Sequence, residues 1–115
     1  MEKIVLIGDR EVKMRITART LPEYREAFGK DLLSELNRCS DGITTGTADY
    51  SVFENLAWLM AKKAGEEVHA DLPPKQAVEE WLDEFDSVLA IVNAIPDIME
   101  LWGMANETTS RARKK

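Results

Sequence analysis

Reactive side chains are nearly absent from this chain, whose 115 residues include one cysteine and one histidine. The lone Cys39 excludes an internal disulfide, is typical of a reducing compartment, and is expected to act as a small buried apolar residue. A metal site needs several convergent ligands, so His69, with acidic neighbours only, is interpreted as a solvated loop histidine. No zinc spacing, P-loop, nucleophile elbow or dinucleotide motif is present. We therefore expect no catalytic residue, no cofactor and no metal.

Long hydrophobic runs are also missing. The apolar run at the start, 4–7, is too short for a signal peptide. The longest run, 88–95, is interrupted by Asn93 and cannot span a bilayer. These absences predict a cytoplasmic protein without membrane contact. Residues 88–95 are nevertheless apolar on nearly all sides of a helix, which indicates burial or an interface.

Positive charge is scarce outside the last residues. The formal net charge is −6, and four of the basic residues lie within 111–115. Residues 1–110 therefore contain 11 basic and 21 acidic side chains and carry −10. Such a body repels phosphates, so binding to nucleic acid is not expected. The acidic run 79–86 falls on the outer side of an amphipathic helix and is interpreted as a solvated face rather than a pair of catalytic carboxylates.

The first residues read as a β-hairpin over 3–17, with a turn at 8–10. In the second strand Val12, Met14 and Ile16 face one side, while charged residues face the other. An isolated hairpin is only marginally stable in water. We expect it to pack on a helix, and pairing with another chain is a second way to cover it.

The rest of the chain has helical periodicity. Helices are predicted over 21–38, 50–64, 74–93 and 96–107, followed by a disordered basic tail over 108–115. Expected start signals are Thr20, a capping box of Ser51 and Glu54, and the prolines at 73 and 74. Pro96 predicts a break at 94–95. Residues 1–107 thus read as one globular domain of mainly α, α+β class: an N-terminal hairpin and four to five helices packed as a small bundle.

Three tryptophans are the most informative residues that are present. Trp81 and Trp102 lie on apolar helical stripes with Phe85 and Leu101, either as core or as walls of a groove for a partner helix. Trp58 falls on the polar side of its helix, so it is either covered by another element or a hot spot of an interface. The partner-binding candidates are Trp58, Trp81, Phe85, Leu101 and Trp102.

Four segments, in order along nearly the whole chain, carry a resemblance to a known family. They are Tyr24-Arg25-x-x-Phe28-Gly29-x-Asp31-Leu32-Leu33, Glu54-Asn55-Leu56-Ala57-Trp58-Leu59-Met60-Ala61-Lys62, Glu80-Trp81-Leu82-Asp83-Glu84-Phe85 and Leu101-Trp102, the last followed by Thr108-Thr109 and a tail ending in lysine. In this ordered set the chain resembles the tail assembly chaperones of long-tailed, siphovirus-type phages and prophages of Gram-positive bacteria.

The resemblance implies a protein that is not an enzyme. Such chaperones act in the host cytoplasm, bind the tape measure protein before the tail tube forms around it, keep it soluble, and are absent from the mature virion. A longer form made by ribosomal frameshifting recruits tail tube protein, and this chain resembles the short form. Self-association into a homo-oligomer stays open. The alternative is an acidic protein-binding adaptor or anti-repressor-like regulator.

Overall fold

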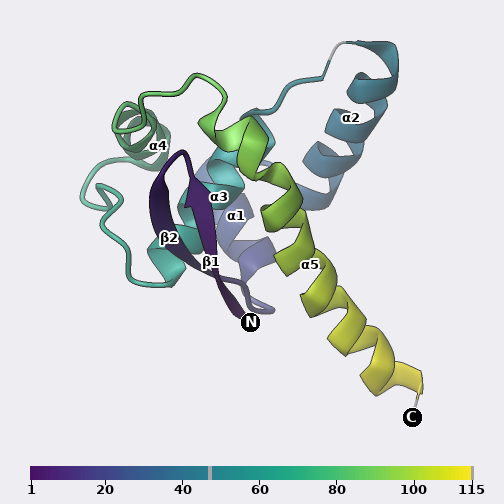
Figure 1. Cartoon of the computed structure of the whole chain (residues 1–115). Helices are drawn as coiled ribbons and strands as arrows, with labels where there is room; N and C mark the ends of the chain where they lie inside the picture. Colours follow the sequence, from purple (N-terminus) through teal and green to yellow (C-terminus); the bar gives the residue numbers. More distant parts are fainter. Residues whose placement is uncertain (47, 115) are drawn as a thin grey trace.

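The computed structural model describes residues 1–46 and 48–114, with the side chains of all of these except residue 44 and residues 105–114. Its elements in chain order are β1 (Glu2–Ile7), β2 (Arg10–Arg15), α1 (Thr20–Phe28), α2 (Leu32–Thr45), α3 (Ser51–Lys63), α4 (Pro74–Leu82) and α5 (Ala90–Lys114) (Figure 1). The predicted mainly α, α+β class with an N-terminal hairpin is confirmed. No helix within the described residues is long and apolar enough to cross a membrane.

The hairpin forms as the alternating pattern predicts. β1 and β2 pair antiparallel with Ile7 opposite Arg10, which leaves Gly8 and Asp9 as a two-residue turn. Gly8 has a φ of 65°, the left-handed conformation that such turns require. The inward side chains are buried: Val5, Ile7, Val12 and Met14.

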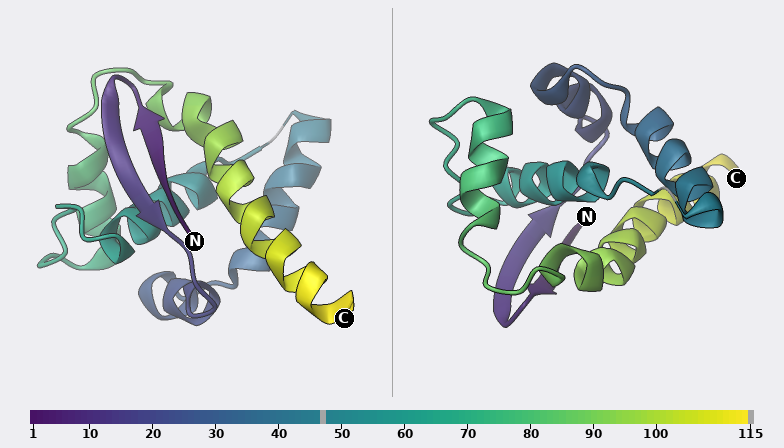
Figure 2. Two further views of the ribbon diagram at one scale, coloured as in Figure 1. Left: turned by 60° about the horizontal axis from the view of Figure 1, so that its bottom comes forward. Right: turned by 90° about the horizontal axis from the view of Figure 1, so that it is seen from above.

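α3 is the central helix. It contacts β2 and every other helix, and eight of its thirteen residues are buried. The inner face of the hairpin packs on α3, while α5 lies along β1 (Figures 1 and 2). Lys3 of β1 fixes this second contact, because its Nζ lies 2.9 Å from Glu100 Oε2 and 3.6 Å from Asp97 Oδ1. The core therefore lies between the hairpin, α3 and the near side of α5.

The single helix predicted over 21–38 is wrong. Gly29 ends α1 with a φ of 68°, and its N–H donates to the carbonyl of Arg25. Asp31 then starts α2, since its carboxylate accepts from the N–H and the hydroxyl of Ser34. These hydrogen bonds, the backbone one foremost, also lower the pKa of Asp31. A left-handed glycine followed two residues later by an N-cap aspartate is sufficient to divide the helix.

The predicted break at 94–95 is also wrong. α4 already ends at Leu82, the connection covers residues 83–89, and α5 continues through Pro96. Aspartate and serine in the connection are poor helix formers. Pro96 lies on the exposed side of α5, where water can reach the carbonyl that loses its partner.

Several predicted helix ends differ in detail. The capping box of Ser51 and Glu54 does not form; Asp49 Oδ1 instead accepts from the Ser51 N–H at 3.0 Å. Thr20 is the first residue of α1 rather than its cap, with Oγ1 accepting from the Thr17 N–H. Gly65, directly after the last turn of α3, has a φ of 90°. α5 runs to Lys114, so the backbone over 108–114 is helical where a disordered tail is predicted, and residue 115 lies outside the description.

Candidate protein-binding surface

Three of the five predicted partner-binding residues lie in the core. Trp58, Trp81 and Leu101 are at most 1% exposed and offer no contact surface in this fold. For Trp81 and Leu101, the sequence allows either a place in the core or a place in the wall of a partner groove, and their burial agrees with the first. Phe85 and Trp102 are half-buried and remain accessible at the edge of the core.

Trp58 is buried because a loop folds back over the polar side of α3. Its Nε1–H donates to the carbonyl oxygen of Val68 at 2.8 Å. The ring of Phe28 meets the indole edge-on at 5.9 Å, and Lys62 Nζ lies 5.3 Å from the ring centroid. The interpretation of Trp58 as an exposed hot spot is therefore wrong. Helical periodicity could not reveal this, since the covering residues come from an irregular segment.

α5 carries two apolar stripes side by side. The first packs into the core and consists of Ile91, Ala94, Ile98 and Leu101. The second, which we call the α5 flank, begins two residues before the helix and consists of Val88, Val92, Ile95, Met99 and Trp102. Val88 is 95% exposed, Val92 37% and Met99 38%. The flank's alternating spacing of four and three residues matches the seam along which one helix packs on another.

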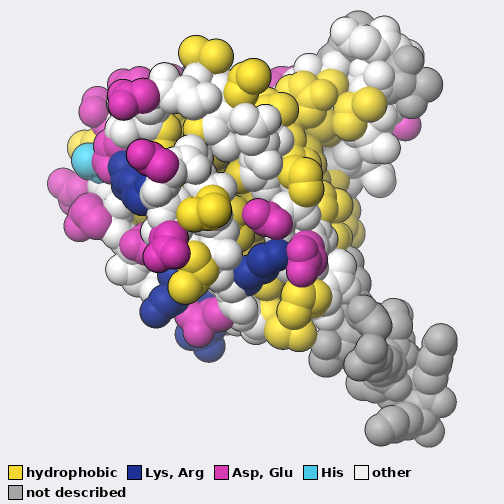
Figure 3. Space-filling model, in the orientation of Figure 1, with side chains coloured by type: hydrophobic (Ala, Val, Ile, Leu, Met, Phe, Trp, Pro, Cys, Tyr) yellow, Lys and Arg dark blue, Asp and Glu magenta, His cyan; other side chains and the backbone are white. Residues whose placement is uncertain are grey.

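The α5 flank points away from the hairpin, because Asp97 and Glu100 occupy the side of α5 that faces β1. On the opposite side lies α2, which makes no close backbone contact with α5 in the described chain. α2 exposes Leu33 and Ile43. Figure 3 shows hydrophobic side chains extending over α5 toward α2, whereas charged side chains gather over β2 and α4. One side of the molecule thus presents apolar side chains on two separate helices.

A cavity of about 310 Å³ lies at the upper end of the α5 flank. We call it the Glu54 pocket; it is lined by Tyr50, Glu54, Leu82, Phe85, Asp86, Ser87, Val88, Ala90, Ile91 and Val92. This lining includes two carboxylates and neither lysine nor arginine. Burial, and then the charge of Asp49, raises the pKa of the half-buried Glu54. The pocket is therefore apolar and of negative potential.

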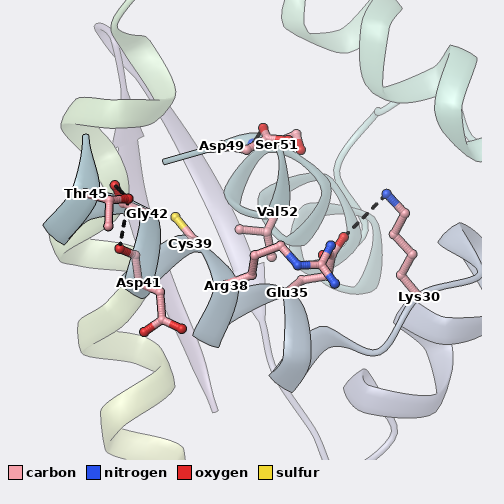
Figure 4. Close-up of a pocket in the computed structure, with 10 residues that line it drawn as sticks. All are labelled: Lys30, Glu35, Arg38, Cys39, Asp41, Gly42, Thr45, Asp49, Ser51 and Val52. Atoms are coloured by element: carbon pink, nitrogen blue, oxygen red, sulfur yellow. Dashed lines mark hydrogen bonds and ion pairs between the residues drawn. The ribbon is translucent and has the colours of Figure 1, made fainter. Parts of the chain in front are cut away.

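A second cavity, about 370 Å³, lies between α2 and the start of α3 (Figure 4). Three of its charged side chains pair with one another: Glu35 lies 3.6 Å from Lys30 Nζ and 3.1 Å from an Arg38 nitrogen. Cys39 lines this cavity and is buried, as expected. Burial, and then the charge of Asp49, raises the pKa of the Cys39 thiol. The thiol is thus held protonated, and the thiolate that a nucleophile needs is disfavoured.

His69 lies in a loop and is solvent-accessible, as the sequence predicts, and it also takes part in an ion-pair network. Glu84 pairs through one oxygen with His69 Nε2 and through the other with Arg10, at 2.9 Å. Arg10 also lies 4.3 Å from the centre of the Phe85 ring. Among the described residues no group of three or more side chains is placed to hold a metal ion. The network ties the hairpin, the 64–73 loop and the end of α4 together.

This network predicts a pH dependence of stability. The hydrogen bond to Glu84, with the charges of Glu84, Glu67 and Glu80, raises the pKa of His69 above 6.5. Because the folded state holds the proton more tightly, the contribution is fully present below pH 6.5 and is lost as the pH rises through the raised value. His69 has a φ of 59°, a left-handed conformation that asparagine tolerates. His69→Asn should therefore unfold at a lower urea concentration than the wild type in acid, and the difference should close in alkali. A difference independent of pH would contradict this.

Fold and surface together define a small α+β protein with exposed apolar side chains along α5 beside a pocket that contains two carboxylates. Comparison with known proteins gives it no family: no protein-family model, no curated protein and no solved structure matches the chain.

Proposed function

We propose that this protein is a tail assembly chaperone, which binds the helical, apolar segments of a tape measure protein and keeps that protein soluble until the tail tube forms. The α5 flank is the observation that carries the proposal. Val88, Val92 and Met99 form an exposed stripe with helix-packing spacing on a well-packed body. A contiguous apolar stripe of this kind on a small domain marks an interaction site.

The charge of the body supports the same role. Residues 1–110 carry −10, so complexes with apolar partner segments would repel one another and stay dispersed. The acidic surface also attracts basic partners and speeds their association. In this proposal the protein acts by binding alone, without a chemical step.

The position of the C-terminus fits a longer form with a second partner. α5 leads away from the hairpin and α4, so its end lies apart from the rest of the molecule (Figure 1). An extension added there by frameshifting would leave the upper part of the α5 flank free. We propose that such a form recruits tail tube protein while the domain holds the tape measure protein.

Co-expression tests the proposal. Wild-type protein should raise the soluble fraction of a co-expressed candidate tape measure protein, and the double variant Val92→Asp, Met99→Asp should lose most of this effect. The matched control is Leu21→Asp on α1, since Leu21 is as exposed as Met99 at 38%. Circular dichroism should show all variants folded. Failure of the wild type across several tape measure fragments would refute the chaperone function, whereas full activity of the double variant would refute the α5 flank as its surface.

A further inference from the structure

The Glu54 pocket contains a carboxylate without a counter-charge. Glu54 lies in the first turn of α3 and is half-buried beside Leu82 and Val92. Among the described residues its carboxylate has neither a hydrogen bond nor an ion pair, and Asp49 is the charge that acts on it. Asp86, also in the lining, adds a further negative charge. No lysine or arginine lines this pocket; Lys30 and Lys75 line a neighbouring cavity with Glu54, and neither forms an ion pair with it among the described residues.

Partial removal of a carboxylate from water costs free energy, and an opposite charge placed against it recovers that cost. The other walls of the pocket, including Phe85 and Val88, are apolar. The complementary group is therefore a cation on an aliphatic stem, which describes lysine and arginine. A purely apolar side chain would leave Glu54 uncompensated, and an acidic one would be repelled.

The pocket is continuous with the α5 flank, because Val88 and Val92 belong to both. Within α5, from Val92 to Trp102, the flank covers about 15 Å at the rise of an α-helix, and Val88 precedes the helix. A partner helix of about three to four turns would cover this flank with one face and place a residue near its end over Glu54. Apolar packing would supply affinity, and the charge would fix the register.

We propose that the Glu54 pocket receives a lysine or arginine side chain from an amphipathic partner helix that lies along the α5 flank. This inference rests on the proposed function and adds the kind of segment that the protein selects. The partner segments are those in which a basic residue stands at one end of an apolar helical face. Segments with an acidic residue at that position are rejected.

Two fluorescent amphipathic helical peptides test the inference by anisotropy. They share one apolar face and differ at a single position near its end, lysine in one and norleucine in the other. Wild-type protein should bind the lysine peptide about tenfold more tightly than the norleucine peptide. Glu54→Gln should lower affinity for the lysine peptide to that of the norleucine peptide and leave the latter unchanged. The control Glu80→Gln removes the same charge from an exposed position of α4 and should preserve the preference.

The outcomes separate the inference from the proposed function. The inference is overturned if wild-type protein binds both peptides equally. It is also overturned if Glu54→Gln and Glu80→Gln lose the same affinity for the lysine peptide. The co-expression assay still reports the proposed function in either case. Binding of neither peptide overturns the inference as well. If size-exclusion chromatography then shows a dimer that Val92→Asp dissociates, a second copy covers this surface instead. Loss of the co-expression effect for the wild type refutes the function itself.

Discussion

Replacing Trp58 by alanine should lower the free energy of unfolding by about 3–5 kcal/mol. The side chain is 1% exposed at the centre of the fold, in contact with the ring of Phe28. Its removal leaves a cavity between α3, α1 and the 64–73 loop that the surrounding helices cannot close without moving. The loop would also lose the hydrogen bond that holds Val68 against α3. Urea unfolding followed by circular dichroism measures the change.

Two further variants separate the packing of Trp58 from its hydrogen bond. Trp58→Phe retains much of the ring but leaves the buried Val68 carbonyl without its donor, at a cost of about 1–3 kcal/mol. Trp102→Ala removes a half-buried indole from the α5 flank and should cost less than Trp58→Ala. If Trp58→Ala remained within about 1 kcal/mol of the wild type, the indole would not be part of the core.

The position of Trp58 illustrates what sequence reasoning can and cannot find. Alternation in β2 correctly predicts which side chains face inward, because a strand has only two sides and Val12 and Met14 share one of them. Helical periodicity likewise places Trp81 on an inward stripe. Trp58 lies off the inward stripe of α3. Its burial cannot be predicted from helical periodicity, because the loop that covers it has no periodic pattern. The relevant contact, Nε1–H to the Val68 carbonyl, involves a backbone atom that no side-chain pattern encodes.

Helix boundaries show a similar division. Gly29 and Asp31 are visible as signals, but the apolar face extending across them favours one continuous helix until backbone geometry is known. Pro96 gives the opposite error, since a proline on the water-exposed side of a helix is tolerated where a buried one would break it. In both cases, whether a local sequence signal ends the helix depends on which side of the helix meets water.

The exposed apolar surface could be predicted in part. Residues 88–95 are apolar nearly all round, which indicates burial or an interface; Ile91 and Ala94 face the core, whereas Val88 and Val92 face solvent. Of the predicted partner-binding residues, Trp102 belongs to the α5 flank and Phe85 lines the Glu54 pocket. The environment of Glu54 could not be predicted, because it depends on two segments distant in sequence, 50–54 and 82–92, that meet at the pocket.

The neighbouring residues Ile98 and Met99 should respond very differently to alanine. Ile98→Ala should lower the free energy of unfolding by about 2–5 kcal/mol, because the side chain is fully buried in the core stripe of α5. Met99→Ala should change it by less than about 1 kcal/mol, since that side chain is 38% exposed on the flank. The two substitutions sit one residue apart, so helix propensity and position along α5 are closely matched.

The effects of Ile98→Ala and Met99→Ala on partner binding should be in the reverse order of their effects on stability. Met99→Ala should weaken binding of the tape measure protein by shortening the apolar flank, whereas Ile98→Ala, assayed at a temperature where circular dichroism shows it folded, should bind as the wild type does. Urea unfolding and a pull-down on the same preparations give both quantities. Because α5 places its two apolar stripes about 100° apart on one helix, each residue belongs to one stripe only. Equal loss of stability in the two variants would show that the α5 flank is covered within the protein itself and is not a docking surface.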